Sequence, residues 1–256
     1  MTILRKVRAL LPEYDYIYFG DNARAPYGTR SFEVVYQYTL EAVEYLQGLG
    51  CDLIILACNT ASAKALRSIQ QNDLPRLGAE KRVLGVVRPT VEKVGDLTKT
   101  RKVGILATEG TVASRSYTIE IGKLASDVEV FEQACPMWVP LIENGEWETE
   151  GADYFIKKYV GQLMSQCGDI DTVVLGCTHY PIIKEKIEAA LPEGITVVEQ
   201  GEIVAESLKD YLRRHSDMEH KCDKGGSVTY LTSERAEKFA QAASKLIGER
   251  LEAKTI

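Results

Sequence analysis

The stretch DTVVLGCTHYP, residues 171–181, decides the architecture of this chain. An apolar run over residues 172–175 stands directly before a glycine, and Cys177, Thr178 and His179 follow. A short, continuous apolar run closed by glycine predicts a strand that is buried on both faces of a parallel sheet. Because ligands of open α/β sheets bind beyond the carboxyl ends of the strands, the polar residues after this run are candidates for a functional site.

The same pattern occurs earlier in the chain. DLIILACNTA, residues 52–61, has an aspartate, an apolar run and a small residue before Cys58, which is followed by Asn59 and Thr60. Two parts of the chain therefore each present one thiol at the same kind of strand end. We interpret this echo as two halves that face each other across a cleft, with a base on each wall.

Strand and helix patterns alternate along the chain, which is typical of an α/β fold with mostly parallel sheets flanked by helices. The segments 134–146 and 215–226 are predicted as loops. Predicted strands cover residues 14–19, 53–56, 83–87, 102–107, 128–131, 172–175, 195–198 and 228–231.

Composition excludes several classes of protein. The 256 residues carry a formal net charge of −6, which argues against a nucleic-acid or acidic membrane surface as partner. No apolar stretch approaches the ~18 residues of a transmembrane helix, and the basic N-terminus does not resemble a secretory signal. We therefore expect a cytoplasmic protein that does not bind membranes.

The six cysteines form no C-x2-C pair, so the sequence predicts neither a structural zinc site nor a disulfide framework. We interpret four of them as structural: Cys51, Cys135, Cys167 and Cys222.

A thiol between a strand end and a helix N-terminus is biased toward the thiolate by the positive end of the helix. His179 is placed to exchange protons with Cys177. The small polar residues Asn59, Thr60 and Thr178, with helix N-terminal amides, suit a carboxylate ligand. From the residues alone, Asp21 is either a turn residue or a site carboxylate, and Glu143 is equally open.

Five segments together resemble bacterial glutamate racemase, of the aspartate/glutamate racemase superfamily. They are FGDNARAPYGTRS (19–31), ACNTAS (57–62), GILATEGTV (104–112), ACPMWVPLIENGE (134–146) and LGCTHYP (175–181). The resemblance implies an isomerase that interconverts L- and D-glutamate without a cofactor or metal and supplies D-glutamate for cell-wall peptidoglycan. It also implies two pseudo-symmetric α/β lobes with the active site between them: residues 1–85 with 199–256, and residues 86–198.

The same resemblance implies roles for individual residues. Cys58 and Cys177 would be the two acid/bases, one acting as base for each enantiomer, and His179 and Glu143 would support Cys177. Dimers are common in the family, so we expect a homodimer. The implied contacts to glutamate are Pro26, Tyr27, Gly28, Asn59, Thr60 and Thr178, with Asp21 near the site.

Two departures from the family pattern stand out. Family members begin with a strand and an aspartate-serine motif before the helix that starts here at Thr2, and Met1 falls at the end of that motif. The missing aspartate would support Cys58, and loss of a residue that orients a catalytic base can cost about 10⁴ in rate. A smaller departure is Val198-Glu199-Gln200, where relatives often carry an aspartate-serine pair.

Three other functions remain open. An aspartate racemase would share the two cysteines, and would turn over L-aspartate faster than L-glutamate. A catalytically impaired chain would bind glutamate without exchanging its α-hydrogen with solvent. A dithiol redox protein is disfavoured, because a substrate carbon between the thiols would hold them beyond disulfide reach.

We predict that this chain is weakly active or inactive and less stable than a relative with the first strand, because neighbouring strands are left unpaired. The measurement is racemisation followed by circular dichroism on this chain and on one extended upstream by a strand. Equal activity of the two would contradict the prediction.

Overall fold

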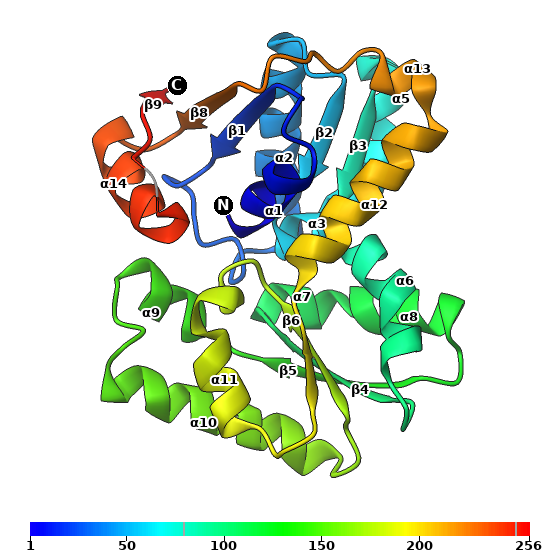
Figure 1. Cartoon of the computed structure of the whole chain (residues 1–256), viewed down its shortest axis with the longest axis vertical. Helices are drawn as coiled ribbons and strands as arrows, with labels where there is room; N and C mark the ends of the chain where they lie inside the picture. The colour runs from blue at the N-terminus through cyan, green and yellow to red at the C-terminus, as the bar shows by residue number, and fades with distance from the viewer. Residues whose placement is uncertain (79, 249) are drawn as a thin grey trace.

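The computed structural model describes residues 1–78, 80–248 and 250–256 (Figure 1). Parallel sheets are flanked by helices in two halves, which confirms the predicted fold class. The strands are β1 (Tyr16–Gly20), β2 (Leu53–Leu56), β3 (Arg82–Gly85), β4 (Lys102–Ala107), β5 (Glu129–Ala134), β6 (Thr172–Gly176), β7 (Thr196–Val198), β8 (Val228–Thr232) and β9 (Ala253–Thr255).

The helices of the first 130 residues are α1 (Thr2–Leu10), α2 (Phe32–Gly48), α3 (Asn59–Lys64), α4 (Leu66–Ser68), α5 (Leu74–Leu77), α6 (Val87–Leu97), α7 (Glu109–Ser114) and α8 (Ser116–Leu124), with a π-helical turn at Ile69–Asp73. The later helices are α9 (Trp138–Glu143), α10 (Glu150–Gln166), α11 (Lys184–Ala190), α12 (Gln200–Arg214), α13 (Ser216–Glu219) and α14 (Ala236–Ile247), with a 3₁₀ turn at Tyr180–Ile183. No helix in the described ranges is long and apolar enough to cross a membrane.

The lower half of Figure 1 is built on one parallel sheet of strand order β5-β4-β6-β7. Helices α9, α10 and α11 cover one face, where Trp138, Ile156 and Leu163 are buried. Helices α6 and α8 cover the other face through Val94 and Tyr117. Burial on both faces explains why β4 and β6 read as continuous apolar runs.

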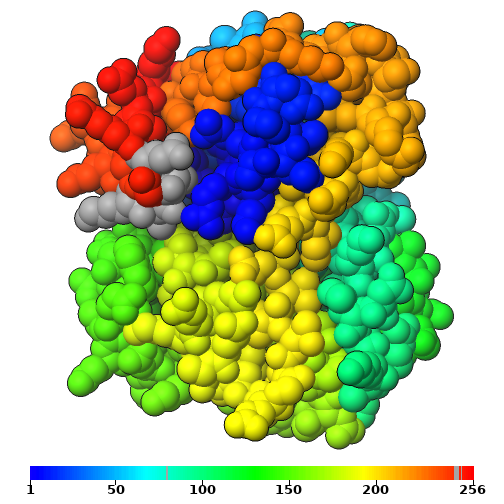
Figure 2. Space-filling model, in the orientation of Figure 1, coloured from blue at the N-terminus to red at the C-terminus, as the bar shows by residue number. Residues whose placement is uncertain are grey.

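The upper half combines the two ends of the chain. Helix α1 packs against α12 through Ile3, Val7, Leu208 and Leu212. Figure 2 shows the blue N-terminal residues between red C-terminal residues and the yellow-orange residues of α12. β3 ends at Gly85 and α12 begins after β7, close to the predicted lobe boundaries, which stay a prediction.

The upper half holds two separate sheets within the described residues. β1 pairs with β8, and β2 pairs with β3, each in parallel. A cavity of about 570 Å³ is lined by β1 and β2 along their full lengths, and also by Val7 of α1 and Val43 of α2. Backbone groups on the facing strand edges therefore lack a sheet partner in the described part of the chain, which is costly unless water or another segment satisfies them.

Several local predictions were wrong. The predicted loop 134–146 contains α9, and the predicted loop 215–226 begins with α13. Helix α3 starts at Asn59, directly after the candidate thiol, with Cys58 as its N-cap. β5 runs on to Ala134, so Cys135 also follows a strand end. These differences arise at element ends, where tertiary contacts override local pattern.

Trp138 anchors the core behind Cys177. Its ring is 1% exposed and lies 4.7 Å from that of Tyr180 and 6.0 Å from that of Tyr159, between ring centroids. Its indole N–H has no hydrogen-bond partner among the described residues.

We predict that Trp138→Ala lowers the free energy of unfolding by about 3–5 kcal/mol, because it leaves a large cavity. Trp138→Phe should cost less than half as much, since it keeps a ring and removes the unpaired N–H. Urea unfolding of the three proteins measures both values. Equal losses in the two variants would contradict this explanation.

Candidate active site

Cys58 lies between the end of β2 and the first turn of α3. It is the N-cap residue of α3, and its carbonyl accepts the N–H of Ser62 at 2.9 Å. Burial raises the pKa of the Cys58 thiol, the backbone N–H groups of Ala61 and Thr60 act against that rise, and the nearby Cys177 adds to it. The amides of this turn are thus the groups that favour a Cys58 thiolate.

Cys177 lies at the end of β6 and faces a histidine and a carboxylate. Its Sγ is 3.7 Å from Nδ1 of His179, and Nε2 of His179 is 2.5 Å from Oε1 of Glu143. Burial opposes protonation of His179, but its hydrogen bonds to Cys177 and Glu143 outweigh burial and raise its pKa to about 9. The hydrogen bond from His179 also lowers the pKa of Glu143. Near neutral pH, Cys177 therefore faces an imidazolium.

The two thiols line one cavity, although they come from different sheets. A charge on Cys177 raises the pKa of Cys58, because like charges close together disfavour each other. The site therefore disfavours two thiolates at the same time.

The loop between β1 and α2 forms another wall and carries Asp21, Pro26 and Tyr27. Asp21 accepts hydrogen bonds from Tyr27 through its hydroxyl, from Arg24 at 2.7 Å and from Ser233 at 2.7 Å. Burial, together with the hydrogen bond to Asp21, raises the pKa of the Tyr27 hydroxyl far above its usual range. Asp21 thus holds the loop that presents Pro26 and Tyr27 to the cavity.

Gly28 lies where the loop meets the lower half. Its carbonyl accepts the N–H of Gly110 at 2.7 Å, and a Cβ on Gly28 would lie only 2.7 Å from the Cβ of Thr108. Only glycine lets the backbone at position 28 come this close to Thr108. Gly28 therefore joins the two halves at the wall of the cavity.

The remaining predicted contacts also line the cavity. The hydroxyl of Thr60 is 2.9 Å from that of Thr108, and the carbonyl of Thr178 accepts the hydroxyl of Thr2 at 2.7 Å. Asn59 is 2% exposed, and its amide is bound to other side chains. All eleven predicted site residues are therefore brought to one cavity, and their roles in the reaction stay predictions.

Comparison with known proteins assigns the family. Residues 1–208 match the model of the Asp/Glu/hydantoin racemase family. The glutamate racemase of Aquifex aeolicus is 34% identical over 255 residues, which span 99% of this chain and 92% of that protein.

The chain belongs to the glutamate racemase family.

The enzymes of this family are isomerases, and the resemblance seen in the sequence motifs is confirmed. A glutamate racemase isoform from Bacillus anthracis superposes with a TM-score of 0.89 at 28% identity, over 100% of this chain and 92% of that one. The Francisella tularensis glutamate racemase, solved in complex with D-glutamate, gives a TM-score of 0.87 at 28% identity with the same coverage.

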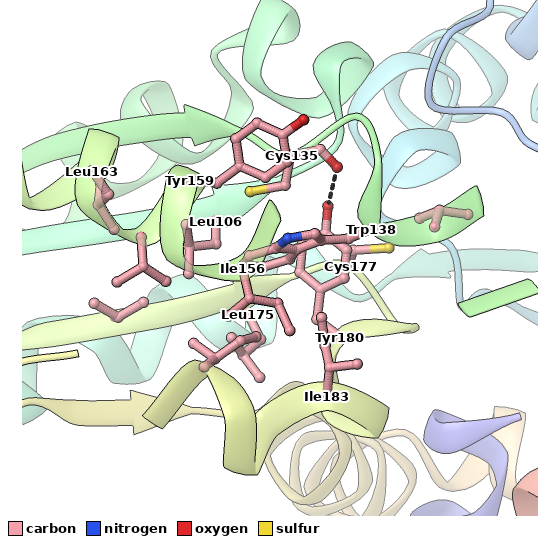
Figure 3. Close-up of a cluster of buried hydrophobic side chains, with 14 of the residues drawn as sticks. Leu106, Cys135, Trp138, Ile156, Tyr159, Leu163, Leu175, Cys177, Tyr180 and Ile183 are labelled. Carbon is pink, nitrogen blue, oxygen red and sulfur yellow. Dashed lines mark hydrogen bonds between the residues drawn. The ribbon is translucent and has the colours of Figure 1, made fainter. Parts of the chain in front are cut away.

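Sequence reasoning missed Cys135 and Thr108, which also line the cavity. Figure 3 shows Cys135, Trp138, Cys177 and Tyr180 in one cluster, with the Tyr180 hydroxyl directed at the Cys135 carbonyl, 3.4 Å away. Burial raises the pKa of Cys135 well above its ordinary value, so this thiol stays protonated. A longer β5 would have put Cys135 among the candidates, and Thr108 is already part of the GILATEGTV motif.

No group of three or more His, Cys, Asp or Glu side chains placed to hold a metal occurs in the part of the chain that the structure describes.

We predict that Glu143→Gln lowers the pKa of His179 toward 6.5 and reduces kcat about 10- to 100-fold, because the carboxylate no longer holds the imidazolium. NMR titration of the His179 ring measures the first effect without requiring activity. Glu146→Gln, three residues beyond the end of α9 and exposed, is the control. An unchanged His179 titration in Glu143→Gln would contradict the prediction.

The same pair makes folding depend on pH. Because the pKa of His179 is raised from 6.5 to about 9 on folding, the stabilisation is complete below pH 6.5 and is lost as the pH rises through about 9. We expect a loss on the order of 1–2 kcal/mol, since partial exposure of Glu143 screens the pair. Urea unfolding between pH 6 and 10 should show this loss of unfolding free energy, and the loss should be smaller in Glu143→Gln.

Proposed function

We propose that this protein interconverts L- and D-glutamate with two thiols: one of Cys58 and Cys177 removes the α-proton, and the other delivers a different proton to the opposite face of the carbon. The observation that carries the proposal is that two thiols, each at the carboxyl end of a strand in a different sheet, line one cavity. A planar carbanion between two such groups can lose a proton on one side and gain one on the other. No cofactor is needed in this scheme.

The residues around each thiol suit these steps. When Cys177 acts as the base, its thiolate is paired with the His179 imidazolium, and Cys58 delivers the new proton. When Cys58 acts as the base, the N–H groups of Thr60 and Ala61 stabilise its thiolate, and Cys177 delivers the proton. After one turnover the former base carries the substrate's proton and the former acid is a thiolate, and proton exchange with solvent restores the starting protonation states.

Glutamate is the proposed substrate because the cavity offers hydroxyls and amides for its carboxylates, from Thr60, Thr108 and the first turn of α3. The complex of the Francisella tularensis relative with D-glutamate supports this choice. We further propose that the enzyme acts in the cytoplasm as a homodimer and that its D-glutamate enters peptidoglycan synthesis.

One observation favours a second candidate, a glutamate-binding chain with impaired catalysis. The cavity continues from Cys58 along the unpaired edges of β1 and β2. In the described residues, moreover, the groups that lower the pKa of Cys58 are backbone N–H groups and the Thr60 hydroxyl. Cys177 instead has the His179–Glu143 pair beside it. Slow turnover with intact glutamate binding would fit this alternative.

We predict that Cys58→Ser and Cys177→Ser each lower kcat for racemisation at least about 100-fold in both directions, because each thiol takes part in both directions. Polarimetric or circular dichroism assays with L- and D-glutamate measure this. Cys167→Ser replaces a free cysteine outside the cavity and should keep full activity.

Faster turnover of L-aspartate than of L-glutamate would contradict the proposed substrate. Full activity in either of the two cavity variants would contradict the mechanism.

A further inference from the structure

Gln200 is a buried polar residue at a junction of both halves. It is the first residue of α12, only 2% exposed, and its side chain reaches Asn59 of α3, Thr90 of α6 and Tyr117 of α8. It also lies in a segment where the sequence departs from the family pattern. The two N–H groups of Gln200 Nε2 have four acceptors within reach, so both donors stay paired and the buried amide is held in place.

The hydrogen bonds form a closed ring. Oε1 of Gln200 accepts Nδ2 of Asn59 at 2.5 Å, and Nε2 of Gln200 lies 2.8 Å from the Tyr117 hydroxyl and 3.1 Å from Oδ1 of Asn59. The Tyr117 hydroxyl in turn donates to Oδ1 of Asn59 at 2.8 Å. Nε2 also faces the Thr90 hydroxyl at 3.0 Å and the Val86 carbonyl at 3.4 Å.

This ring requires a side chain at position 200 that carries a hydrogen-bond donor and an acceptor at the same distance from its Cα. A glutamate at position 200 would present only acceptors when ionised, and would face the acceptor Oδ1 of Asn59. An asparagine would be one methylene too short for the same set of contacts. Glutamine therefore fits the position by chemistry and by length.

The ring ends next to a proposed catalytic thiol. Asn59 is the residue after Cys58 and the first residue of α3, and Cys58 itself is the N-cap of that helix. The thiol makes no side-chain cap hydrogen bond, but the backbone N–H groups of Thr60 and Ala61, in the same turn, act to lower its pKa. Fixing the Asn59 side chain fixes the start of this turn, and with it the position of these amides relative to the sulfur.

We propose that Gln200 is a positioning residue for Cys58: by holding Asn59 against Tyr117, it aims the first turn of α3 at the thiol. The inference rests on the proposed two-cysteine mechanism, and it deepens it by giving Cys58 a support that comes from α12. The side chain of Gln200 does not itself line the main cavity, so it acts through Asn59 and not on the substrate.

The effect should be selective for one thiol. Apart from the turn amides, the titratable groups that face Cys58 are Cys177, Tyr18 and Tyr27. Cys177 has its own support from His179 and Glu143, which lie outside the ring, although Tyr117 of the ring is electrostatically coupled to Cys177. Loss of the ring should therefore disfavour the Cys58 thiolate and leave that of Cys177 largely unchanged.

The test is the rate of alkylation of each cysteine by iodoacetamide between pH 6 and 10, read by mass spectrometry of the two peptides. In Gln200→Ala we expect Cys58 to react about tenfold more slowly at pH 8, with its profile moved to higher pH, and Cys177 to change less than twofold. Gln200→Glu and Gln200→Asn should also slow alkylation of Cys58 more than that of Cys177. The effect should be smaller in a variant that keeps part of the ring.

Gln47→Ala is the matched control, because Gln47 is another buried glutamine, in α2, outside the cavity lining. It should slow neither cysteine selectively. In the Gln200 variants, kcat for glutamate should fall about tenfold while KM changes less, since substrate contacts remain.

Equal change at both cysteines in all three Gln200 variants, or no change at Cys58, would overturn the proposal. The alkylation result does not depend on turnover. If the unchanged chain fails to racemise glutamate, the proposed function fails, but the selective loss at Cys58 still reports on Gln200.

Discussion

The site depends on one geometric constraint: strand ends from two different sheets must face each other at a fixed separation. Each of the two sheets carries one of the thiols at a strand end. Contacts between the two halves bring both thiols to the lining of the same cavity. These contacts are short and polar, such as Gly110 N–H to the Gly28 carbonyl and Thr60 to Thr108. Small residues at the junction let the backbones approach, so the distance between the thiols is set by backbone rather than by long side chains.

The two thiols have different surroundings, although their sequence patterns match. Cys177 faces the His179–Glu143 pair, which can hold a charge or pass a proton. Cys58 relies on the amides of its own helix turn, and the cavity beside it continues between β1 and β2. In the proposed mechanism both thiols act in each direction, so the weaker of the two would limit turnover. The network around Gln200 matters for that reason.

Sequence alone predicted the parts of the site that are local. The pattern of a strand, a small residue and a cysteine predicted both thiols, and His179 lies two residues from Cys177. Glu143 needed the family resemblance, because it reaches His179 only through α9, which had been predicted as a loop. Gln200 lies 141 residues from Asn59, and no periodicity indicates such a contact. Cys135 was missed because the end of β5 was placed too early.

The central claim is that one thiol removes the α-proton and a different thiol delivers its replacement. The position of deuterium in the product tests this claim most directly. L-glutamate is incubated with the protein in D₂O, and the reaction is stopped at low conversion. The two enantiomers are then separated, and the deuterium content of each is measured by mass spectrometry. Two bases predict that the D-glutamate formed carries deuterium at the α-carbon, whereas the recovered L-glutamate carries almost none. Deuterium spread equally over both enantiomers, or D-glutamate that keeps the original hydrogen, would contradict the account.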